Sequence, residues 1–162
     1  MSGRRDVAVV SRGRTVVEAA EASQRVLETD PALLFTGRWV FPAVVGTTTG
    51  ADGWTGVGST RTVRLAGGGT IGEQLTAHRP GEIYAYDLGR FPRPLDLLVS
   101  GARSEVRFRP GAGGGTELIW RFVFHPRPFR RPMAGLLLAG PWRRYLDDVV
   151  ARTVGLLDAR VA

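Results

Sequence analysis

The stretch GVGSTRTVRLAGGGTIGEQLTAH, residues Gly56–His78, decides the fold that we predict for this chain. Two runs of alternating residues flank the segment Ala66–Gly69, and glycine supplies the positive φ angles that tight turns need. The pattern predicts a β-hairpin. Because side chains alternate along a strand, each arm has one inward row, which is Val57, Ser59, Arg61, Val63 and Leu65 on the first arm and Ile71, Glu73, Leu75 and Ala77 on the second.

One charged residue interrupts each of these apolar rows. Arg61 lies in the first row and Glu73 in the second, and the hairpin register places them either opposite or diagonal to each other on one face. Both placements bring a guanidinium within reach of a carboxylate. Charges on an inward face need each other, water or a ligand. Arg61 and Glu73 are therefore candidate site residues, with a purely structural salt bridge as the alternative.

Composition predicts one globular domain over residues 1–162. The chain has 162 residues and 43% hydrophobic content, enough for a real core. No apolar run reaches the roughly 18 residues of a membrane-spanning helix, and the N-terminal residues lack the apolar centre of a signal peptide, so we expect a cytoplasmic protein. The absence of cysteine excludes disulfides, thiol nucleophiles and cysteine-ligated metals.

Arginine supplies all of the basic charge. The formal net charge is +7, with 22 arginines and no lysine. Arginines gather in the segment His125–Arg131 and again at Arg143 and Arg144. Arg127, Arg130 and Arg131 can make weak contact with an anionic surface, such as phosphates or lipid headgroups. The alternative is a solvated loop and helix start, and we do not expect nucleic acid as a partner.

The N-terminal part of the chain predicts a strand and two short helices. A strand lies within Asp6–Val17, and Glu18–Leu27 has the Ala, Glu, Gln and Arg content that favours a helix. Proline after Asp30 breaks this helix, and a second short helix can begin at Pro31. We expect Gly37–Trp54 to be a long connection with little structure of its own.

Three more strands and a long helix follow the hairpin. Leu95–Val99 is a short strand or connecting helix, and the C-terminal helix covers Pro141–Arg160, with Met133–Ala139 as a kinked extension. The strands are Glu82–Leu88, Ala102–Arg109 and Thr116–Phe124. The predicted inward residues are Tyr84, Tyr86 and Leu88, then Ser104, Val106 and Phe108, then Thr116, Leu118, Trp120, Phe122 and Phe124, and on the helix Trp142, Leu146, Val149, Val150, Thr153, Leu156 and Leu157.

These elements predict an α+β fold. A curved antiparallel sheet of six to seven strands wraps around the long C-terminal helix, with two short helices after the first strand. The residues that carry a family resemblance are Gly58, Arg61, the glycine turn, Glu73, Tyr86, a strand that opens Gly115-Thr116 and holds Trp120, and a helix that closes on Leu156-Leu157. In this order they resemble the SRPBCC superfamily, the START-related helix-grip fold, and in particular its polyketide cyclase/dehydrase and lipid-transport branch.

The resemblance implies a cavity between sheet and helix that holds a lipid, an isoprenoid or a polyketide-like molecule. Aromatic side chains with a few polar groups are typical of such pockets. The alternative for the aromatic residues is an ordinary core. The candidate ligand-binding residues are Arg61, Glu73, Tyr84, Tyr86, Phe108, Trp120, Phe122, Trp142 and Leu146.

We expect neither a cofactor nor a metal site. His78 and His125 fall in the outward phase of their strands or at strand ends, and no nucleophile elbow, P-loop or dinucleotide fingerprint is present. Three functions remain open: a carrier or sensor of a hydrophobic ligand, a polyketide cyclase or dehydratase, and an arginine-rich module that binds protein or RNA. In the enzyme, Glu73 is the base, Arg61 stabilises an enolate oxygen, and Tyr84 or Tyr86 donates a hydrogen bond.

Overall fold

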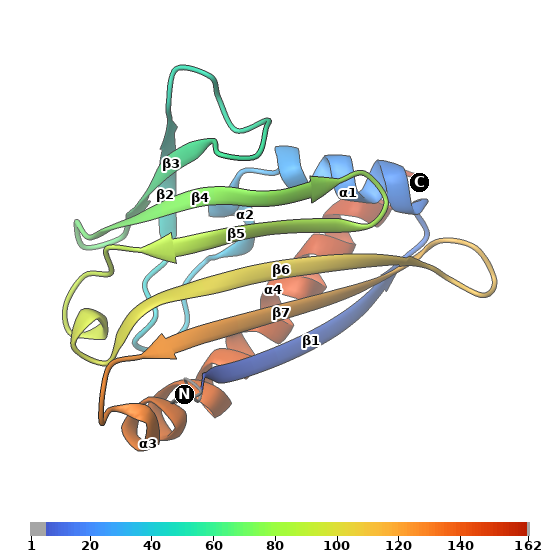
Figure 1. Ribbon diagram of the computed structural model, residues 1–162. Helices are drawn as coiled ribbons and strands as arrows, with labels where there is room; N and C mark the ends of the chain where they lie inside the picture. Colours follow the sequence, from blue (N-terminus) through green and yellow to red (C-terminus); the bar gives the residue numbers. More distant parts are fainter. Residues whose placement is uncertain (1–5, 162) are drawn as a thin grey trace, which may run out of the picture.

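The computed structural model describes residues 6–161 and shows a curved antiparallel sheet wrapped around a long C-terminal helix (Figure 1). Within these residues the sheet has seven strands in the order β1-β7-β6-β5-β4-β3-β2. This architecture confirms the predicted fold class. The strands are β1 Val7–Thr15, β2 Val44–Thr49, β3 Thr60–Leu65, β4 Thr70–Arg79, β5 Ile83–Gly89, β6 Val99–Pro110 and β7 Thr116–Pro126.

Two short helices connect β1 to the rest of the sheet, as predicted. They are α1, Ala19–Glu28, and α2, Pro31–Leu34. The Asp30 side chain caps α2 by accepting a hydrogen bond of 2.9 Å from the Ala32 N–H, and Pro31 occupies the first helical turn, where its missing N–H costs nothing. The run before β6 forms a short 3₁₀ helix, η1, over Leu95–Leu97.

The C-terminal helical region includes the predicted extension before Pro141. It begins with α3, Arg131–Ala134, continues through the π-helical segment η2, Gly135–Ala139, and ends with α4, Gly140–Ala159. Figure 1 shows α4 running across the sheet, from the end that carries α3 to the end that carries α1. Four aliphatic side chains of α4 are buried, and at about 1.5–3 kcal/mol each they hold the helix against the sheet, namely Leu146, Val149, Val150 and Leu157. The prediction that Leu156 also faces inward is wrong, because this side chain is exposed.

The predicted loop Gly37–Trp54 contains a strand. Strand β2 pairs with β3 at the edge of the sheet, from Val44 opposite Leu65 to Thr49 opposite Arg61. Its valines and threonines favour a strand, but an edge strand has only one neighbour and little to bury, so no alternation of apolar and polar residues marks it. The first arm of the hairpin is also shorter than predicted. It begins at Thr60, so Val57 is exposed and does not belong to an inward row.

A β-bulge in β4 changes which residues of this strand face inward. The register shifts between Leu75 and Ala77, which places Ala77 opposite Ala85 and His78 opposite Tyr84. Paired residues in antiparallel strands share a face, so His78 lies on the inner face with Tyr84. The prediction that His78 faces outward is wrong at this point, because the bulge adds one residue to the strand.

Two polar contacts tie α4 to β1. Ser11 Oγ donates a hydrogen bond of 2.5 Å to Asp147, and Thr15 Oγ1 donates one of 2.5 Å to Asp158. Gly115 lets the turn before β7 approach the end of β1: its φ is +69°, and a Cβ at this position would lie 2.3 Å from the carbonyl oxygen of Thr15. None of the helices in residues 6–161 is long and apolar enough to cross a membrane.

Candidate functional site

A cavity of about 510 Å³ lies between the inner face of the sheet and the C-terminal helical region. Its walls come from β3, β4, β5 and β7, its roof from η2 and α4, and its sides from α2 with the loop after it and from the β5–β6 loop. Of the residues that line it, only Glu73 and Arg93 carry charge. The volume falls within the range of about 300–1,000 Å³ that is typical of small-molecule sites.

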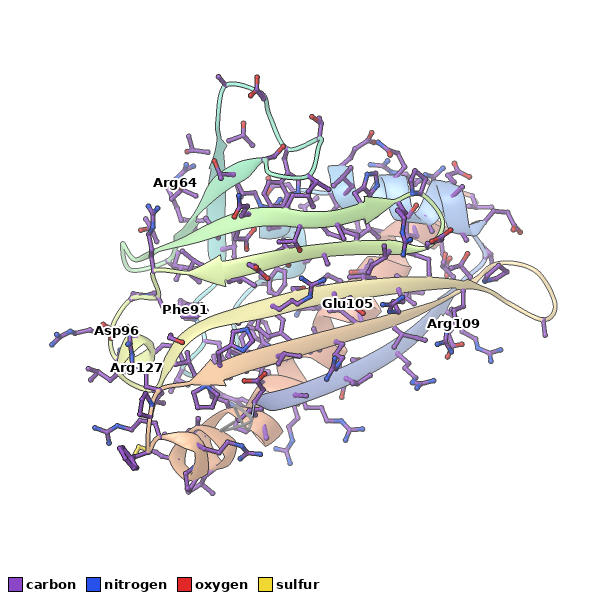
Figure 2. All side chains as sticks on the ribbon, viewed as in Figure 1. Arg64, Phe91, Asp96, Glu105, Arg109 and Arg127 are labelled. Carbon is purple, nitrogen blue, oxygen red and sulfur yellow. The ribbon has the colours of Figure 1, made fainter. Side chains whose placement is uncertain are left out.

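The cavity reaches the surface at one end of the molecule. Val40 and Leu137 both line it and are exposed by 83% and 49%. The β5–β6 loop forms another part of this opening, through residues that include Pro92, Arg93 and Pro94. In Figure 2, Phe91 and Asp96 of this loop lie at the same end of the sheet as Arg127, and Arg109 lies at the opposite end. We call this opening the mouth.

A buried ion pair stands in the β3–β4 hairpin. Arg61 lies directly opposite Glu73, and its Nε donates a hydrogen bond of 2.5 Å to Glu73 Oε2. The two residues are exposed by only 7% and 8%. Of the two, Glu73 lines the cavity and Arg61 does not. Arg61 therefore binds the carboxylate without itself reaching the cavity. The Glu73 carboxylate is the only acidic group of the cavity wall.

Aromatic rings enclose the guanidinium. Arg61 Cζ lies 4.0 Å from the centre of the Trp54 ring and 5.5 Å from that of Tyr86, distances at which a cation is attracted to the face of a ring. Trp54 Nε1 donates a hydrogen bond of 3.0 Å to the Tyr84 hydroxyl. The Tyr84 and Tyr86 rings are 5.3 Å apart. These contacts stabilise a positive charge that burial disfavours.

Burial shifts the pKa values of the groups around this pair. It raises the pKa of Glu73 above its ordinary value, although the Arg61 guanidinium lowers it in part. It also raises the pKa of Tyr84 to about 12 and that of Tyr86 well above its ordinary value. Both tyrosines therefore keep neutral hydroxyl groups at physiological pH. Burial is the largest influence on Arg61 and opposes its charged form, but Glu73, Tyr84 and Tyr86 together outweigh burial and raise the pKa of Arg61.

The roof of the cavity is an aromatic cluster around Trp142. Its ring centre lies 4.8 Å from that of Phe122, 4.9 Å from that of Phe41 and 5.2 Å from that of Tyr145. The Tyr145 hydroxyl accepts a hydrogen bond of 2.9 Å from the Gly37 N–H, which ties the loop after α2 to α4. Trp142 Nε1 is buried and has no hydrogen-bond partner within residues 6–161. Trp142 lines the cavity, and an unpaired buried donor costs about 1–3 kcal/mol.

The structure brings some of the sequence-predicted site residues to the cavity and leaves others outside it. Those that line it are Glu73, Tyr86, Phe122 and Trp142. Those that are buried but do not line it are Arg61, Tyr84, Phe108, Trp120 and Leu146. Phe108 and Trp120 lie on inward faces as predicted, but they pack in the closed part of the core. For example, Trp120 Nε1 donates a hydrogen bond of 2.8 Å to Ser104 Oγ.

Sequence reasoning missed several residues of the site. Phe35, Phe41 and Phe91 line the cavity from loops or loop-like segments, where no periodicity indicates which side chains face inward. Trp54 covers Arg61 from a connection that has no regular pattern. Tyr145 is different, because its spacing of three from Trp142 places it on the same helix face and could have identified it. Within residues 6–161 no three His, Asp or Glu side chains gather to hold a metal ion.

The fold and the cavity define the class of the protein: a helix-grip domain with an internal apolar cavity. A family model described as polyketide cyclase / dehydrase and lipid transport matches residues 8–157. The chain therefore belongs to this family of the SRPBCC superfamily, as the sequence resemblance indicated. A search of curated proteins found no match.

Solved structures share the fold at low sequence identity. A protein of Nitrosospira multiformis is 12% identical, with a TM-score of 0.67, and the alignment covers 95% of this chain and 98% of that one. A point mutant of Thalictrum flavum norcoclaurine synthase in complex with a transition-state analogue is 14% identical, with a TM-score of 0.67 and coverages of 96% and 99%. Ara h 8.0201 is 12% identical, with a TM-score of 0.64 and coverages of 94% and 97%. At these identities the likeness concerns the fold alone.

Proposed function

We propose that this protein binds a hydrophobic small molecule, such as a lipid, an isoprenoid or a polyketide-like compound, in the cavity beneath α4. The observation that carries the proposal is the cavity itself, with about 510 Å³ of space and a lining in which only Glu73 and Arg93 are charged. Burying apolar ligand surface there contributes roughly 25 cal/mol per Å². The family description, which names lipid transport, supports the same reading.

The wall also favours a ligand that carries an acceptor oxygen. Trp142 Nε1 provides an unpaired hydrogen-bond donor, and Tyr86 lines the cavity with a hydroxyl whose high pKa keeps it protonated. A carbonyl or hydroxyl oxygen on an otherwise apolar ligand satisfies these donors. A pure hydrocarbon leaves them unpaired. We therefore expect the bound compound to be apolar with at least one oxygen atom.

Native mass spectrometry of the gently purified protein tests this proposal. We expect a mass increment from an apolar, oxygen-containing compound that organic solvent extracts, at no more than one copy per chain. The Trp142→Phe variant keeps an aromatic ring in the roof but loses the N–H, so it is expected to retain less of the compound. A protein that carries no increment and also takes up no added fatty acid, sterol or aromatic polyketide would contradict the proposal.

A second candidate function is that of a cyclase or dehydratase. Glu73 favours it, because this residue is the only acid in the cavity wall and burial raises its pKa toward the range of a general base. In such a reaction Glu73 accepts a proton from a carbon next to a carbonyl group, and the Tyr86 hydroxyl donates a hydrogen bond to the enolate oxygen. Arg61 keeps the carboxyl group in place and does not itself reach the cavity. A solved structure of the same fold is named a synthase, which shows that the fold accommodates enzymes.

Turnover of a poly-β-ketone substrate distinguishes the two candidates. If the protein is an enzyme, Glu73→Gln abolishes product formation while ligand binding remains, and Tyr86→Phe lowers kcat more than it changes KM. If the protein is a carrier, the wild type forms no product and both variants still bind.

We further propose that the chain forms one ligand-binding domain. Its cytoplasmic location stays a prediction.

A further inference from the structure

Exposed apolar side chains surround the mouth of the cavity. Phe129 is fully exposed, with a value of 101%, and Leu136 is exposed by 79%. Five further exposed apolar residues lie close to these two along the chain or around the mouth. We call all seven the rim: Trp39, Val40, Leu97, Phe129, Met133, Leu136 and Leu137. Leaving so much apolar surface in water is unfavourable, and exposed apolar residues gathered near a cavity opening are typical of interaction sites.

Three chain segments bring the rim together. Val40 follows α2, Leu97 ends η1, and Leu137 belongs to η2. The Arg127 N–H donates a hydrogen bond of 2.8 Å to the carbonyl oxygen of Leu98, which fixes the segment before α3 against the β5–β6 loop. Leu98, Val40 and Leu137 all line the cavity. The rim is therefore continuous with the inside of the cavity.

Arginines stand among the apolar residues of the rim. Residues 126–146 contain five arginines and no acidic residue. All five are exposed, and none forms an ion pair with any residue in 6–161, although Arg127 Nε donates a hydrogen bond to the backbone carbonyl of Asp96. Two guanidinium groups lie close to the Trp39 ring, with Arg38 Cζ at 4.2 Å and Arg144 Cζ at 6.0 Å from its centre. The rim thus combines apolar tips with unneutralised positive charge.

From this combination we propose that the rim docks onto a bilayer that contains anionic phospholipids. The apolar tips enter the boundary between headgroups and acyl chains, and the arginines bind the phosphates. A second copy of this chain is a poor partner, because it would place arginines against arginines. In the docked orientation the mouth faces the acyl chains. A ligand can then pass between bilayer and cavity without crossing water. This passage rests on the proposed ligand binding, whereas the docking itself does not.

Co-sedimentation with phosphatidylcholine vesicles, with and without phosphatidylglycerol, tests the docking. We expect the wild type to bind only the anionic vesicles and to be released by high salt. The variant Arg130→Gln/Arg131→Gln is expected to lose about fivefold in affinity per arginine, and Phe129→Ser/Leu136→Ser about tenfold per residue. None of these four residues lines the cavity. Binding of an apolar dye without vesicles should therefore be unchanged in both variants.

Matched variants elsewhere on the surface control for charge and hydrophobicity. Arg109 and Arg121 are exposed on the sheet, and Val16 and Val57 are exposed apolar residues outside the rim. The variants Arg109→Gln/Arg121→Gln and Val16→Ser/Val57→Ser are expected to bind vesicles like the wild type. Equal losses in rim and control variants would overturn the proposal. The proposal would also be overturned if the wild type does not bind anionic vesicles and instead binds RNA or an acidic protein, or self-associates through the rim. These outcomes do not depend on whether the cavity binds the dye.

Discussion

Replacing Arg61 with leucine tests the buried ion pair. The variant leaves the Glu73 carboxylate, which is 8% exposed, without the guanidinium that now lies 2.5 Å away. Removing one partner of a buried pair costs roughly 3–5 kcal/mol, because the remaining charge stays desolvated. The lost contact between Arg61 and the Trp54 ring belongs to this cost. A domain of this size has roughly 5–15 kcal/mol of stability, so we expect the variant to fold but to be strongly destabilised.

The double variant Arg61→Leu/Glu73→Leu separates the pair from its surroundings. Replacing both charges by apolar side chains is often neutral or stabilising, so we expect its free energy of unfolding to lie within about 2 kcal/mol of the wild type. Urea unfolding, followed by circular dichroism, measures all three proteins. Arg79→Leu is the matched control, because the Arg79–Glu82 pair is solvent-exposed and should change stability by less than about 1 kcal/mol.

The reasoning would be refuted if Arg61→Leu cost no more than the exposed control. That result would mean that water reaches the pair, and that the hairpin does not bury its two charges. A double variant less stable than either single variant would be equally damaging, because it would show that the pair contributes more than two well-packed leucines.

Three further predictions concern titration and the attachment of α4. Since burial raises the pKa of Glu73, the folded state binds the carboxyl proton more tightly than the unfolded state, and the free energy of unfolding should fall as pH rises from about 4.3, the pKa in the unfolded chain, through the raised pKa of the folded protein. Glu73→Gln should remove this part of the pH dependence, and an unchanged pH dependence in the variant would argue against a raised pKa. Tyrosinate absorbance of the folded protein should rise at higher pH than the ordinary value near 10, because burial raises the pKa of Tyr84 to about 12 and also raises those of Tyr86 and Tyr145. Titration of all three tyrosines at the ordinary pH would show that their hydroxyl groups are exposed to water. Asp158 accepts hydrogen bonds from Thr15 Oγ1, at 2.5 Å, and from the Val16 N–H, at 3.0 Å, so Asp158→Ala should lower the free energy of unfolding by about 1–3 kcal/mol. Hydrogen exchange should become faster at the end of α4 but not in β5, and uniform exchange along α4 would contradict this.

Periodicity predicted the parts of the fold that bury one face. Strand β6 and the first part of β7 alternate between inward and outward residues, and α4 carries an apolar stripe, so these faces could be recognised; alternation fails at Val123, which is buried like its neighbours Phe122 and Phe124. Alternation around one glycine turn also placed Arg61 and Glu73 on one face and left open whether they are opposite or diagonal; in the structure they are directly opposite. Elements that depend on their neighbours were missed. Strand β2 forms because β3 offers it an edge; its valines and threonines favour a strand, but the sequence has no alternation of apolar and polar residues that would indicate one.

The site was predictable only where regular elements build it. Glu73 and Phe122 face the cavity because their strands place them there, and Trp142 because of its helix face. The bulge in β4, which brings His78 to the inner face, depends on the curvature of the whole sheet. The sequence could not indicate how far the cavity extends, because helix and sheet pack closely at one end and separate at the other. Phe108 and Trp120 therefore look like cavity residues in the sequence and are core residues in the structure.

Dye binding by a cavity-filling variant tests the central claim, a hollow apolar interior that holds a ligand. Leu88 lines the cavity, and Leu88→Trp places an indole ring in that space. We expect the wild type to bind one molecule of a neutral, environment-sensitive dye per chain, and Leu88→Trp to bind it about tenfold more weakly. Val16→Trp, at an exposed position outside the cavity, should bind like the wild type. Equal dye binding by all three proteins, or none by the wild type, would contradict the account.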